Sequence, residues 1–321
     1  MDYFRKFMCL GPQQRFSKPD RLSNVPDLVM VKILENCDFK AIQCLRKTCK
    51  TFRNFIDTSK PDLKIFRITI TAEKELLTLL FVAKSQFRFE YRISKKMDYC
   101  SSFFKDLLYL LDNQKSRIYN FTINLQFESK SESFEFTKKL EAVLASRLRP
   151  LPVKFLRITV FDEDDVISIL KNLKLKDLHI LNAKNEVGNL NLSPISKMEQ
   201  WKKLKEFEVR GFLGAEPIGI FCHLERIDIQ MREMQMENVE IVKETFLSSP
   251  TPKLYRIGFN TFPNRNQIHL HLGFSENHQW FFPIGQGGGV QISLNAFSIN
   301  FNRIPELKIG IETFRNLREL E

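Results

Sequence analysis

The densest group of side chains that could carry chemistry is acidic. Asp162, Glu163, Asp164 and Asp165 follow one another. Clustered carboxylates can bind a divalent metal, but a metal-dependent nuclease gathers its carboxylates from several strands and not from one run. This run instead opens an apolar segment that ends in lysines, and acids at the start of a helix suit its macrodipole. We therefore interpret the run as an N-terminal helix cap.

Three histidines form a second candidate group. His269 and His271 stand two residues apart in QIHLHLGF, and His278 follows. The alternating pattern of that segment predicts a strand, which would place both rings on one face. Two such imidazoles can share a metal ion, yet no cysteine or carboxylate stands at a recognisable zinc spacing from them. We expect no bound metal.

Two further groups lack the surroundings that their chemistry needs. The glycines from Gly285 to Gly289 would need a strand before them and a helix after them to bind a dinucleotide, but a strand-like pattern follows. Cys222 and His223 are sequence neighbours, which does not make them a catalytic pair. No Gly-x-Ser-x-Gly elbow and no kinase-like set occurs. We predict no catalytic residue and no cofactor, and this pattern favours a binding role.

Composition bounds the class of protein. The 321 residues suffice for roughly two domains. The formal charge of +11 comes from basic residues that are interleaved with acids along the chain. That pattern indicates a solvated basic surface more than a nucleic-acid-binding stripe. The six cysteines include no Cys-x-x-Cys pair, so we expect reduced thiols. Neither a signal peptide nor a membrane span is evident, and we expect a cytoplasmic or nuclear protein.

The N-terminal part should form a small helical module. Residues 1–20 show no periodicity and are expected to be a loose leader. Between residues 21 and 60, three short helices are predicted. Ser23 or Asn24 can cap the first, with Pro26 in its first turn. Three helices of this size bury too little surface to be very stable alone, so several apolar residues should remain free to meet a partner.

From residue 61 to residue 321 the pattern apolar-x-x-apolar-x-apolar recurs, with helical segments between its copies. Strand and helix in alternation predict right-handed parallel β–α units that stack on one another. We expect an α/β fold, an irregular leucine-rich-repeat-like solenoid with a curved parallel sheet and without an asparagine ladder. Alternating segments near the C-terminus predict antiparallel strands that close it. The seven copies begin at Leu63, Ile118, Val153, Leu175, Leu204, Leu224 and Leu254.

In such a solenoid, the strand residues between the apolar positions face the concave side. The early members of this row, from Arg67 and Thr122 onward, are basic or neutral, and the later ones are acidic. We hypothesise that this charge gradient binds a protein substrate of mixed charge. The candidate substrate-binding residues are Arg157, His179, Glu208, Arg210, Asp228 and Gln230.

The segment from Leu22 to Asp57 contains five short motifs in a fixed order: Val25-Pro26-Asp27, Lys32-Ile33-Leu34, Asp38-Phe39, Leu45-Arg46 and Cys49-x-x-Phe52. In this combination the segment resembles an F-box. Two residues, Val25 and Cys37, are smaller than the leucines that are common at these places, which could weaken the docking. The rest of the chain has Phe-rich strands and a closing Phe-Pro-Ile segment, and it looks like the FTH domain that follows F-boxes in a large nematode family.

This resemblance implies a non-catalytic subunit of an SCF-type ubiquitin ligase. The F-box would dock onto a Skp-type adaptor and through it onto a cullin, and residues 61–321 would bind the protein substrate. About half of the candidate anchors should be internal core. Two alternatives remain: a scaffold that recruits a partner without ubiquitylation, and a basic repeat protein that binds nucleic acid with a steep salt dependence. The candidate adaptor-binding residues are Pro26, Leu28, Ile33, Leu34, Phe39, Leu45 and Phe52.

Overall fold

The computed structural model describes residues 25–83, 88–94, 99–160, 162–182, 189–214, 216–275, 277–284 and 288–304. The chain divides into two compact units. The first unit comprises Met1–Asn185 with Met198–Lys203, and the second comprises Glu186–Lys197 with Leu204–Glu321. The predicted leader at residues 1–20 lies outside the described residues, as do Ser23 and Asn24. Within the described ranges, no helix has the length and apolar character needed to cross a bilayer.

The first unit begins with the helical module. Its three helices are α2 (Asp27–Asn36), α3 (Phe39–Thr48) and α4 (Lys50–Ser59). The carboxylate of Asp38 accepts a hydrogen bond from the backbone N–H of Ala41 at 2.8 Å, which caps α3 at its N-terminus. Helix α2 begins after Pro26, so that proline precedes the first turn instead of lying in it. The three predicted helices are confirmed.

A mixed sheet forms the rest of the first unit. Its strand order is β3-β2-β1-β4-β5-β7, with β6 paired to the start of β5. Strands β1, β4, β5 and β7 pair in parallel, whereas β1, β2 and β3 form an antiparallel meander. The strands are β1 (Ile65–Glu73), β2 (Leu76–Ala83), β3 (Arg88–Ser94), β4 (Ile118–Gln126), β5 (Leu151–Val160), β6 (Leu173–Lys174) and β7 (Asp177–Asn182).

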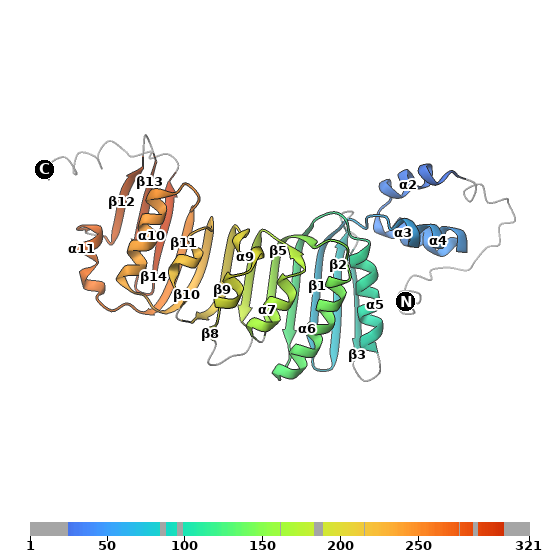
Figure 1. Ribbon diagram of the computed structural model, residues 1–321, viewed down its shortest axis with the longest axis horizontal. Coiled ribbons are helices and arrows are strands. Elements are labelled where there is room, and N and C mark those ends of the chain that lie inside the picture. Colours follow the sequence, from blue (N-terminus) through green and yellow to red (C-terminus); the bar gives the residue numbers. More distant parts are fainter. Residues whose placement is uncertain are drawn as a thin grey trace. The chain divides into compact units, whose positions relative to one another are not determined.

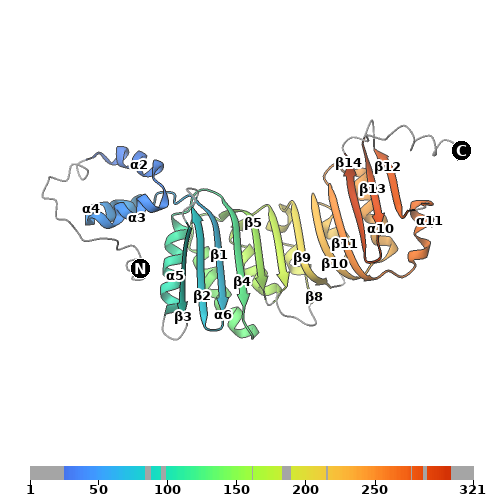
Figure 2. The ribbon, with the colours of Figure 1, turned by 180° about the vertical axis from the view of Figure 1, so that it is seen from behind.

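Helices cover one face of this sheet. In Figure 1, α5 (Tyr99–Asp112), α6 (Lys130–Ala145) and α7 (Glu163–Leu170) lie in front of the strands, and Figure 2 shows the strands from the side without them. The short helix α9 (Glu199–Lys202) also belongs to this unit. Along most of β1, β2, β4 and β5 every second residue, such as Phe121 and Leu156, is buried. This alternation leaves one face of the sheet to solvent.

The second unit also combines parallel and antiparallel strands, which are ordered β12-β13-β14-β11-β10-β9. Strands β9, β10 and β11 pair in parallel, β8 pairs in parallel with β9, and the last three strands pair antiparallel. Its elements are β8 (Asn189–Leu190), α8 (Ser193–Ser196), β9 (Glu206–Leu213), η1 (Ile218–Phe221), β10 (Arg226–Glu233), α10 (Met236–Ser248), β11 (Leu254–Thr261), η2 (Arg265–Gln267), α11 (Ile268–Leu272), β12 (Gln279–Ile284), β13 (Gly288–Leu294) and β14 (Ser298–Ile304).

All seven strands predicted from the recurring pattern are present, and so are antiparallel strands near the C-terminus. One prediction is wrong. The segment around His269 and His271 is helical, because Ile268 and Leu272 are the buried pair and stand four residues apart, at the helical spacing. The two histidines therefore do not share a strand face.

Candidate functional site

An exposed apolar surface lies on helix α2. Leu28, Val29 and Ile33 are 71%, 46% and 37% exposed, although all three are large and apolar. Met30 and Leu34 of the same helix are buried, so these three residues make up the part of its apolar surface that stays exposed. A cluster of apolar side chains left open to water marks an interaction site more often than a structural one. We call these three residues the α2 surface.

The seven predicted anchors of the helical module divide by burial. Pro26, Leu28 and Ile33 are exposed, and Leu45 is half-buried. The remaining three, Leu34, Phe39 and Phe52, are no more than 5% exposed and hold the helices together. Val29 belongs to the exposed set although it is not among the predicted anchors. Its place on the helix, one turn before Ile33, is the signal that would have included it.

The helical module contacts the sheet of the first unit through α3. The ring of Phe39 lies edge-on to Phe81 of β2 at 4.8 Å between centroids. Gln43 donates a hydrogen bond to the hydroxyl of Tyr109 at 3.2 Å, and the guanidinium of Arg46 lies 4.8 Å from that ring. Burial raises the pKa of Tyr109 above its ordinary value, so the phenol stays protonated.

Arg46 is held from its other side by Asp57 of α4. Its Nε lies 2.6 Å from a carboxylate oxygen and its second nitrogen lies 3.0 Å from the other, so the pair is bidentate. The hydrogen bond to Asp57 raises the pKa of Arg46 above its ordinary value. One cation thus joins α3, α4 and, through Tyr109, helix α5 of the sheet.

Three residues of the predicted row lie in register with one another on the open face of the sheet in the first unit. Thr122, Arg157 and His179 are register partners on β4, β5 and β7. Arg67 of β1 does not join them, because its partner on β4 is Asn120 and the partner of Thr122 is Thr69. The predicted row is therefore wrong by two residues in β1.

The reason for this slip lies in the apolar pattern of β1. The prediction equated Phe66 with Phe121, but the residue opposite Phe121 is Ile68. Ile68 is fully buried, whereas Phe66 is 40% exposed and lies on the outside. Because Phe66 is large and apolar but points outward, the apolar pattern of β1 was assigned two residues too early.

Aromatic and basic side chains lie together on this open face. The rings of Phe66 and Tyr119 stack at 4.8 Å, and Tyr119 and Phe155 meet edge-on at 5.1 Å. The ammonium of Lys154 lies 4.3 Å and 4.7 Å from the ring centroids of Tyr119 and Phe155. A hollow of about 410 Å³ is lined by Tyr119 and Phe155 together with Arg67, Thr69, Asn120, Thr122, Leu156, Arg157 and His179.

The sheet of the second unit carries the predicted acidic residues, and each has a cationic neighbour. Arg210 lies 3.3 Å from Glu208, and Arg256 lies 3.9 Å from Asp228. Gln230 extends over the adjacent strand, where its side chain occupies the space that a Cβ at Gly258 would need. The acidic half of the predicted charge gradient is therefore largely balanced within the sheet.

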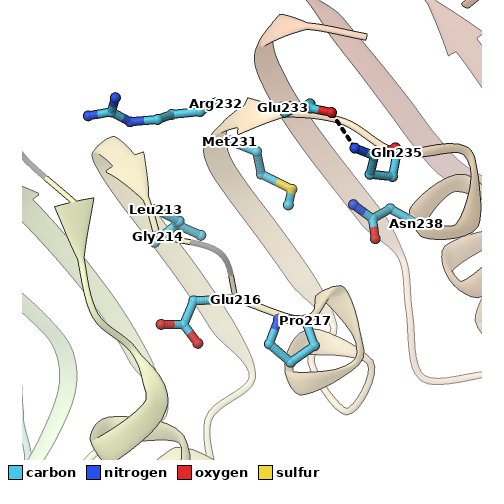
Figure 3. A pocket seen from close by; sticks show the side chains of 9 residues that line it. All are labelled: Leu213, Gly214, Glu216, Pro217, Met231, Arg232, Glu233, Gln235 and Asn238. Atoms are coloured by element: carbon cyan, nitrogen blue, oxygen red, sulfur yellow. Dashed lines mark hydrogen bonds between the residues drawn. The ribbon is translucent and has the colours of Figure 1, made fainter. Parts of the chain in front are cut away.

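A second hollow, of about 530 Å³, opens at the carboxyl ends of β9 and β10 (Figure 3). Met231 and Glu216 line it together with Asn238 of α10. The carboxylate of Glu216 is already engaged, since it accepts hydrogen bonds from the backbone N–H of Leu192 at 2.8 Å and from the hydroxyl of Ser193 at 3.1 Å. It holds the segment between β8 and α8 in place.

The groups that could have carried chemistry have structural partners. Asp162 caps α7 by accepting from the N–H groups of Asp164 and Asp165, as predicted. His271 contacts Glu240 of α10 at 2.5 Å. The sulfur of Cys222 accepts a hydrogen bond from Thr245. Residues 285–287 of the glycine segment lie outside the described part, and no group of three possible metal ligands occurs within it.

Comparison with known protein families finds two domains. Residues 22–64 match the F-box domain, and residues 134–276 match the FTH domain. Comparisons with curated proteins and with solved structures find no significant match. F-box domains in general bind Skp-type adaptors and thereby a cullin, and proteins that carry them are typically non-catalytic substrate adaptors of SCF ubiquitin ligases.

Proposed function

We propose that this chain, which combines an F-box domain with an FTH domain, is a substrate-recognition subunit of a cullin-type ubiquitin ligase. The observation that carries the proposal is the α2 surface. It lies inside the matched F-box and leaves three apolar side chains in water, whereas most apolar residues of the other two helices are covered. A surface of this kind is stabilised by burial against a partner, at about 25 cal/mol for each Å² removed from water.

The second half of the proposal concerns the sheet. We propose that residues 61–321 form one leucine-rich-repeat-like substrate-binding domain, which is longer than the matched FTH range. Support comes from β1 and β4, which lie before residue 134: β4 pairs in register with β5, and β1 pairs in register with β4. The chain would not itself catalyse transfer. It would raise the local concentration of the substrate beside the transferring enzyme, in the cytoplasm or nucleus.

Co-purification with a Skp-type adaptor tests the docking. Leu28→Asp combined with Ile33→Asp places two charges on the α2 surface and should reduce adaptor recovery at least about tenfold, because buried charges without partners are costly at an interface. Both side chains are exposed in the free chain, so the variant should still fold. Leu34→Asp would be a poor test, since Leu34 is buried and its loss would disrupt the module itself.

Leu270→Asp is the matched control. Leu270 of α11 is 70% exposed, almost the same as Leu28, but it lies outside the F-box range. We expect wild-type adaptor recovery from this variant. Equal recovery from the wild type and from Leu28→Asp/Ile33→Asp would show that the α2 surface is not the docking site.

A further inference from the structure

We propose that the open sheet face of the first unit binds an acidic peptide segment of the substrate. The site consists of Arg67, Tyr119, Lys154, Phe155, Arg157 and His179, and we call it the cationic–aromatic surface. That the peptide belongs to a substrate rests on the proposed function, but peptide binding itself can be measured on the isolated chain. It names the chemistry that this face selects.

Charge is the first argument. Arg67 and Arg157 are exposed, and among the residues that the structure describes no carboxylate lies within ion-pair distance of either. The acid closest in register, Asp177, is 5% exposed and does not line the hollow. In the second unit, by contrast, the exposed strand arginines Arg226 and Arg256 lie 3.7 Å and 3.9 Å from Glu206 and Asp228. Within the described ranges, Arg67 and Arg157 of the first unit are thus exposed strand arginines that a carboxylate of a ligand could pair.

Geometry is the second argument. Arg157 and His179 are register partners, and Arg67 lies one pleat away on β1, so three basic groups border the hollow from separate strands. Strands in a sheet stand about 4.8 Å apart. A peptide crossing the strands would therefore pass Arg157 and His179 on adjacent strands and Arg67 two strands from Arg157. Arginine can bind each carboxylate through two parallel hydrogen bonds.

The contacts that the aromatic rings already make favour a peptide over single-stranded nucleic acid as the ligand of this surface. A nucleic-acid platform needs open ring faces on which bases stack. Here Phe66 and Tyr119 stack on each other with planes 10° apart, and the ammonium of Lys154 lies over both Tyr119 and Phe155. Each of these three rings therefore already has a neighbour on at least one face. The rings form an apolar floor, which suits the aliphatic and aromatic side chains of a peptide between its carboxylates.

Fluorescence polarisation on the full chain tests the inference. The probe is a short fluorescein-labelled peptide of glutamate and tyrosine, compared with the same peptide carrying glutamine for glutamate and with labelled oligothymidylate. The glutamate peptide should bind at least about tenfold more tightly than the glutamine peptide, because charge-assisted contacts are lost in the latter. Arg67→Gln combined with Arg157→Gln should weaken glutamate-peptide binding by a similar factor.

Arg226→Gln combined with Arg256→Gln is the matched control. It removes the same charge from exposed strand arginines that already have carboxylate partners, so the affinity should change by less than about twofold. Equal binding of the glutamate and glutamine peptides, or unchanged binding after Arg67→Gln/Arg157→Gln, would overturn the inference. So would tighter binding of oligothymidylate through the same two arginines.

The two proposals can fail separately. Arg67 and Arg157 lie outside the F-box range, so adaptor recovery with Arg67→Gln/Arg157→Gln should equal that of the wild type. A chain that binds the glutamate peptide but no adaptor would sink the ligase role and leave the surface intact. A chain that recovers the adaptor but shows no preference for the glutamate peptide would do the reverse.

Discussion

Glu225 shows how single charges on neighbouring strands contribute to stability. Its carboxylate lies between the ammonium groups of Lys205 and Lys253, the latter at 2.5 Å, and its side chain is 19% exposed. Hydrogen bonds from these two lysines lower the pKa of Glu225 from 4.5 to about 2. The folded state therefore favours the ionised carboxyl, and the stabilisation is present above pH 4.5 and is lost as the pH falls toward 2.

Replacing Glu225 with glutamine should accordingly lower the urea midpoint at neutral pH. The gap between wild type and Glu225→Gln should stay constant down to about pH 5 and narrow below it, because only the ionised form is stabilised. Urea denaturation at several pH values measures this gap. Glu244→Gln serves as the control, since Glu244 is 67% exposed and lies 3.7 Å from Lys243. A gap at Glu225 that does not depend on pH would contradict the assignment.

Tyr255 tests a buried hydrogen bond in the second unit. Its hydroxyl donates to the carbonyl oxygens of Phe221 and Leu224, at 2.9 Å and 3.0 Å, and burial raises its pKa. Tyr255→Phe leaves both carbonyls without this donor and should cost about 1 to 2 kcal/mol in the free energy of unfolding. Amide hydrogen exchange in β11 would show the loss. The exposed Tyr119→Phe should change stability by less than about 0.5 kcal/mol.

At the residue scale, helix caps could be predicted from the sequence, whereas which side chains of a helix are buried could not. Asp162 caps its helix as the sequence predicts, and Asp38 caps α3 in the same way, because a cap depends only on the next few residues. The burial of Leu34 and Phe39 depends on which neighbours pack on the helix. Leu28 and Leu34 belong to the same short motif, and only the three-dimensional arrangement separates the exposed one from the buried one.

At the scale of elements, Asp165 joins two helices. Its carboxylate accepts hydrogen bonds from Ser133 at 2.6 Å and Thr137 at 2.8 Å, so α7 is tied to α6 by an acid that is 3% exposed. Asp165→Ala would leave two buried hydroxyls without this acceptor and should destabilise the first unit by about 2 to 4 kcal/mol. Thermal unfolding would measure it. Its neighbour Asp164 is exposed, and Asp164→Ala should have little effect.

The elements that escaped prediction did so for separate reasons. Strands β2 and β3 do not follow the recurring pattern, because they return antiparallel and need no helix between them. In β2, apolar residues fill both faces, as in Leu76 to Leu80, so no alternation marks it as a strand. The segment Ile268–Leu272 alternates like a strand yet forms α11, since a five-residue stretch fits both periods.

At the scale of the whole molecule, one surface should bind the adaptor and a second surface should bind the substrate peptide. The α2 surface and the cationic–aromatic surface lie on different elements of the first unit, and neither shares a residue with the other. Their functions should therefore separate by mutation. Leu28→Asp/Ile33→Asp should lose the adaptor and keep the peptide, and Arg67→Gln/Arg157→Gln should do the opposite.

A ubiquitylation assay with a reconstituted ligase tests whether both surfaces are needed. The reporter protein carries the glutamate–tyrosine peptide. The wild-type chain should support ubiquitylation of the reporter. Each double variant should lower the initial rate at least about tenfold, because the reaction requires both contacts at once and depends on the local concentration that they create. The matched controls, Leu270→Asp and Arg226→Gln/Arg256→Gln, should keep the wild-type rate. If the wild-type chain binds the adaptor and the reporter and the reporter stays unmodified, the chain is a scaffold and not a ligase subunit, since assembly without transfer is what distinguishes the two.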